Sequence, residues 1–451
     1  MLTQLLSIAR NAFVEGLRQP VFLILVLVSG LCQLMTTWST GFTMGYDETA
    51  EVAGDNKLML DLGLATIFAI GTLLAAFIAT AVMSREIENK TVLTVVSKPV
   101  SRTVLVLGKY VGVSGAILIA VVTMVIFLMF GIRHGVMSTA ADKLDGPVLV
   151  FSLSAIFLSL FLAAWCNFFY GWSFPQTAVV LMLPLCFVAY VLVLALGKQW
   201  QWQPLGTDFK PQITLAALCL VIAIMVLTAA ATAASTRFSQ VTTIVICVGL
   251  FVASLLSNYF IGRYAFENRL VGVISSSVPE DPTKTSFRTP GETILVELQD
   301  APKVPVKPGD SFYYGPDPSG AFLVVPKFDA FEGNLAESST FLGPTSKPAV
   351  IVSAVNGKFL TVRNVGAEAV KVSAPPRASD YVFLRPTKVR WPAFLAWAAL
   401  PNLQYFWLLD AVSQNYTIPP AHVLLVAVYG ATQIMALLSV AVILFQRRDV
   451  G

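Results

Sequence analysis

The sequence predicts an all-α polytopic membrane protein with about eight transmembrane helices, an N-terminal amphipathic helix and an inserted β-rich domain, sandwich-like or barrel-like, before the last span. Three observations support this fold class. The 451 residues are 56% hydrophobic and only 12% charged, about half the charged fraction of a soluble protein. Residues 263–390 nevertheless hold 15 of the 30 Lys and Arg and 13 of the 26 Asp and Glu residues. Outside them, apolar runs long enough to cross a bilayer follow one another.

The composition also excludes several classes of protein. A net charge of +4 without a Lys/Arg block excludes a basic nucleic-acid binder. The five cysteines all lie in apolar stretches, with no CxxC pair and no Cys/His cluster, so neither a disulfide scaffold nor a thiol metal or redox site is expected. We therefore expect no catalytic residue, no cofactor-binding residue and no metal ligand in this chain.

The first nineteen residues are expected to form an amphipathic elbow helix in the membrane interface. Between Leu2 and Leu17 the apolar residues recur at helical spacing, while polar residues such as Arg10 and Glu15 occupy the other positions. A cleaved signal peptide is the alternative. Arg10 and Glu15 interrupt its apolar run and no small-residue cleavage site follows, which argues against it.

Eight apolar runs are predicted to cross the membrane, seven of them within 20–262 and the last within 421–451. They are Pro20–Trp38, Met59–Met83, Leu107–Gly131, Val148–Phe168, Thr177–Leu196, Ile213–Ala234, Val241–Ile261 and Ala421–Phe445. The apolar, aromatic stretch Trp391–Val412 could form a ninth span. Because Pro401 and Asn402 interrupt it, we expect residues 391–420 to form helices at the outer interface instead.

The distribution of Lys and Arg predicts the orientation. With the N-terminus in the cytoplasm, the inner segments carry ten basic residues and the short outer loops carry five. Eight spans then return the C-terminus to the cytoplasm and leave residues 263–390 outside. The expected location is the cytoplasmic (inner) membrane of a prokaryote.

Residues 263–390 show short alternating strands separated by turn residues. The expected strands are Thr293–Leu298, Gly320–Val325, Ala349–Val355, Lys358–Arg363, Val370–Val372 and Tyr381–Leu384. Asn356-Gly357 between two of them predicts a tight hairpin. The segment has neither His nor Cys, so a recognition or docking domain is expected here rather than an enzyme.

The chain offers no evident energy source of its own. No ionisable residue lies in the middle of a span, and Asp61 and Lys109 are expected to be solvated residues at span ends, which disfavours an ion-coupled carrier. A phosphate-binding P-loop is not found, because Gly108-Lys109-Tyr110 lacks the upstream Gly and the following Ser or Thr. An ATPase that drives this chain would therefore be a separate polypeptide.

The loop between the second and third spans carries the most charge of the inner loops. Glu86 and Lys90 are spaced for a helical ion pair, and Pro99 ends any helix at about Lys98. Physical chemistry alone favours a solvated loop that follows the positive-inside rule.

The same loop carries a family resemblance. Glu86, Lys90-Thr91, the apolar run Val92–Val96, Ser97-Lys98-Pro99, Arg102 and Gly108-Lys109 resemble the loop of ATP-binding-cassette (ABC) exporter permeases of the type-2 class. The resemblance covers residues 1–260 and 391–451. It implies that the N-terminal helix is the family's elbow and that 84–106 is a coupling loop docking on the ATPase. The implied coupling residues are Arg85, Glu86, Glu88, Lys90, Thr91, Lys98, Pro99 and Arg102. Family permeases usually have six spans and lack the β insert.

The expected function is therefore that of a non-catalytic permease subunit of an ATP-driven exporter. The expected partners are a separate ATPase subunit that holds ATP and Mg, a second permease copy in a homodimer or heterodimer, membrane lipid and an extracytoplasmic protein bound by the β domain. Two alternatives stay open. One is a mechanotransmitting or scaffolding membrane subunit whose β domain acts on envelope partners, and the other is an ion-coupled transporter.

Overall fold

The computed structural model describes residues 2–40, 48–88, 101–137, 143–284, 286–331, 347–408, 412 and 418–446, with backbone only for 48–56 and 84–88. The chain divides into two compact units. One comprises Met1–Leu255 and Leu403–Gly451, and the other comprises Leu256–Asn402. The first unit is helical and the second is mainly β.

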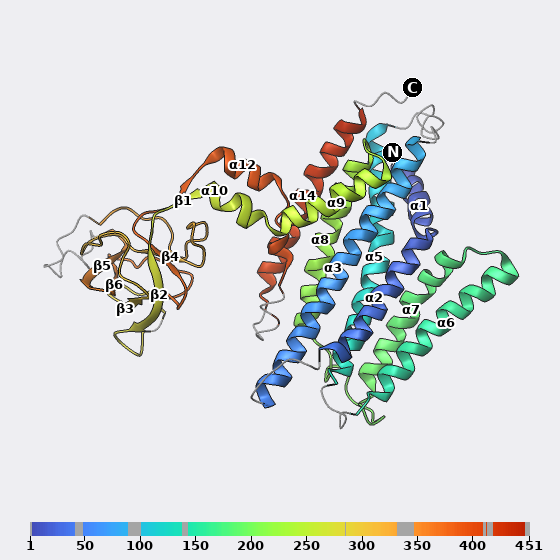
Figure 1. The fold of residues 1–451 in the computed structure, drawn as a ribbon, viewed down its shortest axis with the longest axis horizontal. Helices are drawn as coiled ribbons and strands as arrows, with labels where there is room; N and C mark the ends of the chain where they lie inside the picture. The colour runs from blue at the N-terminus through green and yellow to red at the C-terminus, as the bar shows by residue number, and fades with distance from the viewer. Residues whose placement is uncertain are drawn as a thin grey trace. The chain divides into compact units, whose positions relative to one another are not determined.

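The helical unit is a bundle of long helices (Figure 1). Its elements are α1 (Leu2–Leu17), α2 (Pro20–Ser39), α3 (Glu48–Glu88), α5 (Arg102–His134), α6 (Gly146–Tyr170), α7 (Phe174–Ala195), α8 (Pro211–Ser235), α9 (Gln240–Leu255), η2 (Leu403–Phe406) and α14 (Pro420–Gln446). Pro residues in the first turn of α2, α6, α7 and α8 suit helix starts, where their missing N–H has no intrahelical partner anyway.

The described residues contain seven helices long and apolar enough to cross a membrane, or eight if the bent pair Gln240–Leu255 and Asn258–Ala265 counts as one span. The fold class predicted from the sequence is thus confirmed. The helix in the expected span Val241–Ile261 is interrupted, because α9 ends at Leu255 and a separate π-helix, η1 (Asn258–Gly262), follows. The carbonyl of Leu255 accepts a hydrogen bond at 2.9 Å from Nε2 of Gln404, which satisfies it at the helix end.

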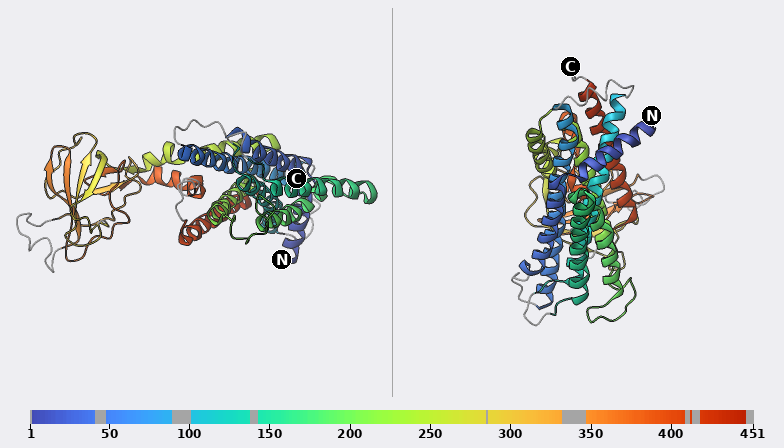
Figure 2. Two further views of the ribbon diagram at one scale, coloured as in Figure 1. Left: turned by 90° about the horizontal axis from the view of Figure 1, so that it is seen from below. Right: turned by 90° about the vertical axis from the view of Figure 1, so that its right-hand side faces the viewer.

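Helix α5 occupies the middle of the bundle and packs against α1, α2, α3, α7 and α8. Its buried residues recur along its whole length, from Val104 to His134. The N-terminal α1, dark blue in Figure 2, runs obliquely to the long helices. Four of its residues are buried, whereas Leu2 and Leu6 are exposed. This distribution suits an interfacial helix that packs one face on protein and leaves another free.

Helices α6 and α7 form an antiparallel hairpin at one side of the bundle (Figure 1). Gly171, in the left-handed region at φ 67°, terminates α6 and allows the tight turn. Most of α6 packs only on α7, so its other face exposes large apolar side chains. These are Val150, Leu153, Phe157, Leu158, Phe161, Trp165, Phe168, Phe169 and Tyr170. Such a face is stable in lipid and would be costly in water.

The second unit combines short helices with two antiparallel sheets. Its elements are η1, α10 (Arg263–Ala265), β1 (Phe266–Glu267), β2 (Leu270–Pro279), β3 (Thr293–Leu298), β4 (Tyr313–Gly315), β5 (Ala349–Asn356), β6 (Phe359–Val365), β7 (Tyr381–Phe383), β8 (Lys388–Val389) and α12 (Trp391–Ala399). Strands β1 and β8 pair at the point where the chain enters and leaves the sheet region. The other six form one sheet in the order β4-β7-β2-β3-β6-β5.

The six-stranded sheet curls until its two edges meet. Ser311, just before β4, bridges to Ile351 in β5, and the amide of Phe312 donates to the carbonyl of Val350 at 2.8 Å. Inside lies a separate hydrophobic core with fully buried Tyr314 and Phe383. Closure in this way covers edge strands that would otherwise expose unpaired backbone groups.

The expected strands Thr293–Leu298, Ala349–Val355, Lys358–Arg363 and Tyr381–Leu384 are confirmed as β3, β5, β6 and β7. Gly357 lies at φ 60° in the expected hairpin turn. The strands expected at Gly320–Val325 and Val370–Val372 are wrong. Gly320 lies in a turn at φ 74°, and the amide of Val370 binds the side chain of Asn364 instead of a strand.

The aromatic stretch after β8 forms no continuous helix in its described residues. Helix α12 has nine residues, too few to cross a bilayer, and the chain is irregular at Pro401 and Asn402. Oδ1 of Asn258 accepts two hydrogen bonds: one from the side-chain nitrogen Nδ2 of Asn402 at 2.7 Å and one from the indole nitrogen of Trp397 at 2.9 Å. The β-rich unit consequently extends beyond 263–390 on both sides, because η1, α10 and α12 pack together.

Candidate functional site

The loop residues singled out from the sequence lie between α3 and α5. Arg85, Glu86 and Glu88 belong to the last turn of α3, where the structure gives the backbone only. Lys90, Thr91, Lys98 and Pro99 lie outside the described residues. Arg102 is the first residue of α5. The described part of the site is therefore the base of the loop, and the bundle end that carries it is called the loop end below.

Helix α5 begins at a defined cap. Ser101 is the N-cap residue, and its hydroxyl accepts a hydrogen bond from the amide of Val104 at 3.3 Å. This bond satisfies one of the amides that a helix start leaves without an intrahelical partner. The loop thus re-enters the bundle at a fixed residue.

Arg102 connects this helix start to the end of the last span. Its Nη1 donates to the carbonyls of Phe445 and Gln446, at 3.2 and 3.0 Å. The guanidinium also lies 5.8 Å from the centroid of the Phe445 ring. A cation on the last carbonyls of a helix satisfies orphan acceptors and complements the helix dipole.

Arg237, directly after α8, binds the same end of α14. Its Nε donates to the carbonyl of Leu444 at 3.0 Å. Arg102 at the start of α5 and Arg237 in the turn after α8 therefore both bind the end of α14. Arg237 is one of the ten basic residues counted above in the inner segments, but the sequence assigned it no structural role.

Lys109 is buried, contrary to the prediction from the sequence. The sequence predicted a solvated residue at a span end, but Lys109 is only 4% exposed, and its Nζ donates to the carbonyl of Val82 at 2.6 Å. Burial of an ammonium group is costly unless it is hydrogen-bonded. Because Val82 precedes the loop and Lys109 follows it, this bond joins the two helices from which the loop emerges.

Glycines on α5 allow the elbow helix to pack closely. A Cβ atom at Gly112 would lie 2.2 Å from the carbonyl oxygen of Ala9, and one at Gly108 would lie 3.1 Å from that of Leu5. Small residues four apart are the usual device for close approach of membrane helices. Gly108, considered above as a failed P-loop residue and as part of the family resemblance, thus serves helix packing.

A small hydrophobic cluster joins these helices at the loop end. The loop-base cluster consists of Met83, Leu105, Val106, Ala233, Ala441 and Phe445, and Ile8 packs against it. Its members come from α3, α5, α8 and α14, with Ile8 from α1. Displacement of the α3 and α5 ends would thus reach three further helices through close-packed contacts.

A second polar cluster lies at the opposite end of the bundle, called the far end below. Nη1 of Arg133 lies 2.7 Å from Oδ2 of Asp145, and Nε of Arg133 lies 3.0 Å from Oδ2 of Asp208. Asp145 is fully buried and also caps α6, accepting from the amide of Val148 at 3.2 Å. The cluster ties α5 to the start of α6 and to the loop before α8.

The described residues show features of a mechanical linkage. In the portion of the chain that the structure describes, no three or more His, Cys, Asp or Glu side chains come together as a metal site. At the loop end, basic side chains donate to backbone carbonyls of other helices, glycines of α5 pack closely against α1, and several helices share one apolar cluster. These can transmit a displacement between helices.

Comparison with known proteins identifies one relationship. Residues 6–166 match the sequence model of a family described as ABC-2 family transporter protein. The match extends from α1 into α6 and includes the loop between α3 and α5, which confirms the resemblance over this part of the chain. No curated protein and no solved structure matches the chain.

Proposed function

We propose that this chain is the permease subunit of an ATP-driven ABC exporter. Two copies would enclose the path of the substrate across the membrane. Two separate ATPase subunits would hold ATP and Mg and supply the energy. Residues 84–106 would form the coupling loop, with Glu86, Glu88 and Lys90 in contact with the ATPase.

The observation that carries this proposal is the construction of the loop base. The loop leaves α3 and enters α5 where Lys109, Arg102 and the loop-base cluster join five helices. A solvated connection would not need such anchoring. The family match over this region supports the same interpretation, since permeases of the ABC-2 family normally pair with an ATPase subunit.

The mechanism follows from close packing. A push on the loop would move the ends of α3 and α5 together, since Lys109 joins them. Through Arg102 the displacement would reach α14, and through Gly108 and Gly112 it would reach α1. Packed helices shift as rigid bodies rather than deforming continuously, so the expected response is a rocking of the bundle.

The proposed orientation places the loop end in the cytoplasm of a prokaryote, with both termini on that side of the inner membrane. The β-rich unit then lies outside. The excess of basic residues in the inner loops supports this orientation.

The charge reversal Glu86→Lys with Glu88→Lys tests the proposal. We expect the double variant to fold and insert, because these residues lie in the last turn of α3, but to lose ATPase subunit during purification. Glu280→Lys, an exposed residue of the β-rich unit, is the matched control. Normal assembly and normal ATP hydrolysis by the double variant would remove the assigned role of the loop.

A mechanotransmitting subunit is the second candidate. It is favoured by the β-rich unit, which has its own closed sheet and core and is entered and left through the β1–β8 pair. Because Glu267 and Lys388 are paired, residues 268–387 can be replaced by an Asn-Gly turn. Loss of the cellular phenotype with intact ATPase coupling and an intact substrate path would favour this candidate. Retained phenotype would favour the exporter.

A further inference from the structure

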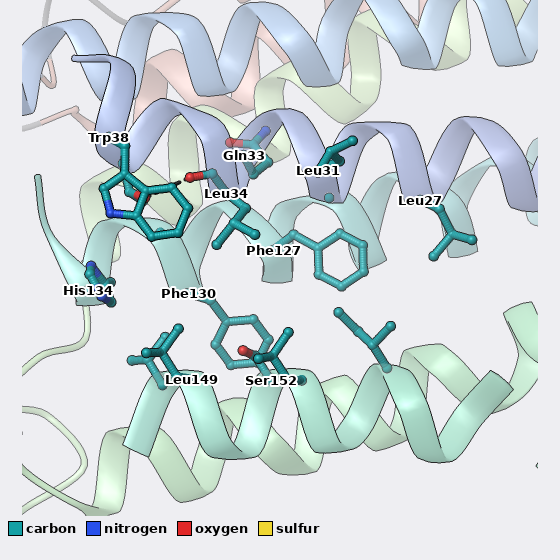
Figure 3. Close-up of a pocket in the computed structure, with 16 residues that line it drawn as sticks. Leu27, Leu31, Gln33, Leu34, Trp38, Phe127, Phe130, His134, Leu149 and Ser152 are labelled. Carbon is teal, nitrogen blue, oxygen red and sulfur yellow. Dashed lines mark hydrogen bonds between the residues drawn. The ribbon is translucent and has the colours of Figure 1, made fainter. Parts of the chain in front are cut away.

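An apolar groove runs along α2, α5 and α6 in the half of the bundle away from the loop end (Figure 3). It has a volume of about 220 Å³. Its walls include Leu27 and Leu31 of α2, Phe127 of α5, and Leu149 and Ile156 of α6. From Leu27 to Trp38 it follows α2 for about 16 Å, given the rise of a helix.

The groove is open at its side. Leu31, Trp38 and Leu153 line it and are exposed. Helices α2, α5 and α6 are all long and apolar enough to cross the membrane, so this opening faces the hydrocarbon of the bilayer. An empty groove would forfeit dispersion contacts along its whole lining, so a flexible hydrocarbon chain from the surrounding lipid is the occupant that fits it.

Few polar groups in the groove are available to a ligand. Nε2 of Gln33 donates to the carbonyl of Gly63 at 2.9 Å, and the hydroxyl of Thr37 donates to that of Leu34 at 2.7 Å. Nδ1 of His134 lies 3.0 Å from the carbonyl oxygen of Gly135. These contacts favour an acyl chain over a polar molecule along the groove.

An exposed lysine lies beside one end of the groove. Trp38, His134 and Leu149 lie together at this end, which is the far end of α5 (Figure 3). Nζ of the exposed Lys198 donates to the carbonyl of His134 at 3.2 Å. The carboxylates of Asp145 and Asp208 share the single guanidinium of Arg133, and among the described residues no acidic side chain lines the groove.

We propose that this groove is a binding site for one anionic phospholipid, with an acyl chain between α2 and α6 and the phosphate beside Lys198. Contacts with the acyl chain alone do not favour the groove over the surrounding bilayer, because the acyl chain comes from an equally apolar environment. The selectivity therefore comes from the ammonium group at the interface, which attracts a net negative headgroup. This inference requires only that the helices span a membrane and is independent of the proposed ATPase coupling.

Photo-crosslinking of the full-length protein in nanodiscs tests the site. The probe is phosphatidylglycerol with a diazirine in its acyl chain, and the adducts are located by peptide mass spectrometry. We expect them to concentrate in Leu27–Trp38, Phe127–His134 and Leu149–Ile156 and to be displaced by unlabelled phosphatidylglycerol. Phosphatidylcholine with the same diazirine should label these segments about five-fold less, the ratio expected for one lysine beside an anionic headgroup.

Matched variants separate the groove from the surrounding lipid-facing surface. Ser152→Phe should fill the groove and remove most adducts, whereas Ser154→Phe, on the exposed side of the same helix, should not. Lys198→Gln should abolish the preference for phosphatidylglycerol, and Lys210→Gln should leave it unchanged. Adducts spread evenly over all lipid-facing helices, or equal labelling by both probes in the wild-type protein, would overturn the proposal. The comparison of the two lipid probes on the wild-type protein tests the proposal even if a variant fails to fold.

Discussion

At the residue scale, three basic side chains organise the loop end by donating to backbone carbonyls of other helices. Lys109 binds Val82, Arg102 binds Phe445 and Gln446, and Arg237 binds Leu444. Ionisable groups at membrane depth are costly unless partnered, so each of these contacts fixes one helix against another. None of these pairings can be derived from residue spacing, since each joins residues distant in the sequence.

Gly112 is expected to be essential for docking of the elbow helix. In Gly112→Ala the new methyl group meets the backbone oxygen of Ala9, which cannot move without shifting α1. We expect a loss of about 1–3 kcal/mol of stability, as for overpacking in a core. Thermal unfolding in detergent measures it. Gly115→Ala, whose methyl meets only the Phe13 ring at 3.3 Å, is the control, and equal melting temperatures for the two variants would contradict the packing described here.

Arg102 is expected to stabilise the junction between α5 and α14. Arg102→Gln keeps much of the aliphatic stem but removes the cation from the end of α14, which should cost about 1–2 kcal/mol. The same thermal assay applies. Arg10→Gln, at an exposed position of α1, should cost nothing measurable. A stability unchanged by Arg102→Gln would mean that this contact contributes little.

Glu292 is expected to be a principal stabilising residue of the β-rich unit. It is 3% exposed and accepts from the amides of Phe287, Arg288 and Thr289 and from the Thr289 hydroxyl. Phe287 lies at φ 50°, so these bonds also hold an unfavourable backbone conformation. Glu292→Ala should destabilise the unit by about 3 kcal/mol, because it leaves buried donors unpaired. Limited proteolysis should show this unit opening first, whereas Glu280→Ala should behave as wild type.

At the element scale, the α6–α7 hairpin depends on the far-end ion cluster. Arg133→Met would leave the buried Asp145 and the partly exposed Asp208 without their cation, and one unpaired buried charge typically costs about 3–5 kcal/mol. We expect a lower melting temperature, with partial recovery in the variant that also carries Asp145→Asn. Lys210→Met provides the exposed control. A double variant as unstable as the single one would argue against charge pairing as the cause.

Elements with a strong local pattern were predicted well from the sequence. Apolar runs identified the long helices, and Asn356-Gly357 identified the β5–β6 hairpin because its turn requires positive φ. Elements fixed by distant contacts were not. Strand β2 was not among the expected strands, although it pairs with both β3 and β7 at the centre of the sheet. The break after α9 was missed as well, since Leu255 is satisfied by Gln404 from far along the chain.

The candidate site divides in the same way. Charge and the family resemblance indicated the loop, and Arg102 was among the residues named. Lys109 and Arg237 were not assigned as anchors, because hydropathy indicates how deep a residue lies in the membrane but does not identify its hydrogen-bond partner. The coupling roles of Glu86, Glu88 and Lys90 stay predictions.

At the scale of the whole molecule, two independently packed units share one chain. The helical unit has one large core and the loop-base cluster, and the β-rich unit has a core of its own. The family match lies wholly within the helical unit and ends inside α6. We therefore expect the helical unit to stay folded when a turn replaces residues 268–387.

We propose that a separate ATPase drives this chain through the loop between α3 and α5. The most direct test of this proposal is a photo-crosslinking amino acid at Thr91, irradiated in native membranes, with the same group at Lys284 of the β-rich unit as the control. We expect Thr91 to capture a polypeptide that carries a P-loop and binds ATP, and Lys284 to capture none. Failure of Thr91 to capture an ATP-binding chain, or capture of such a chain by Lys284 instead, would contradict the proposed coupling through this loop.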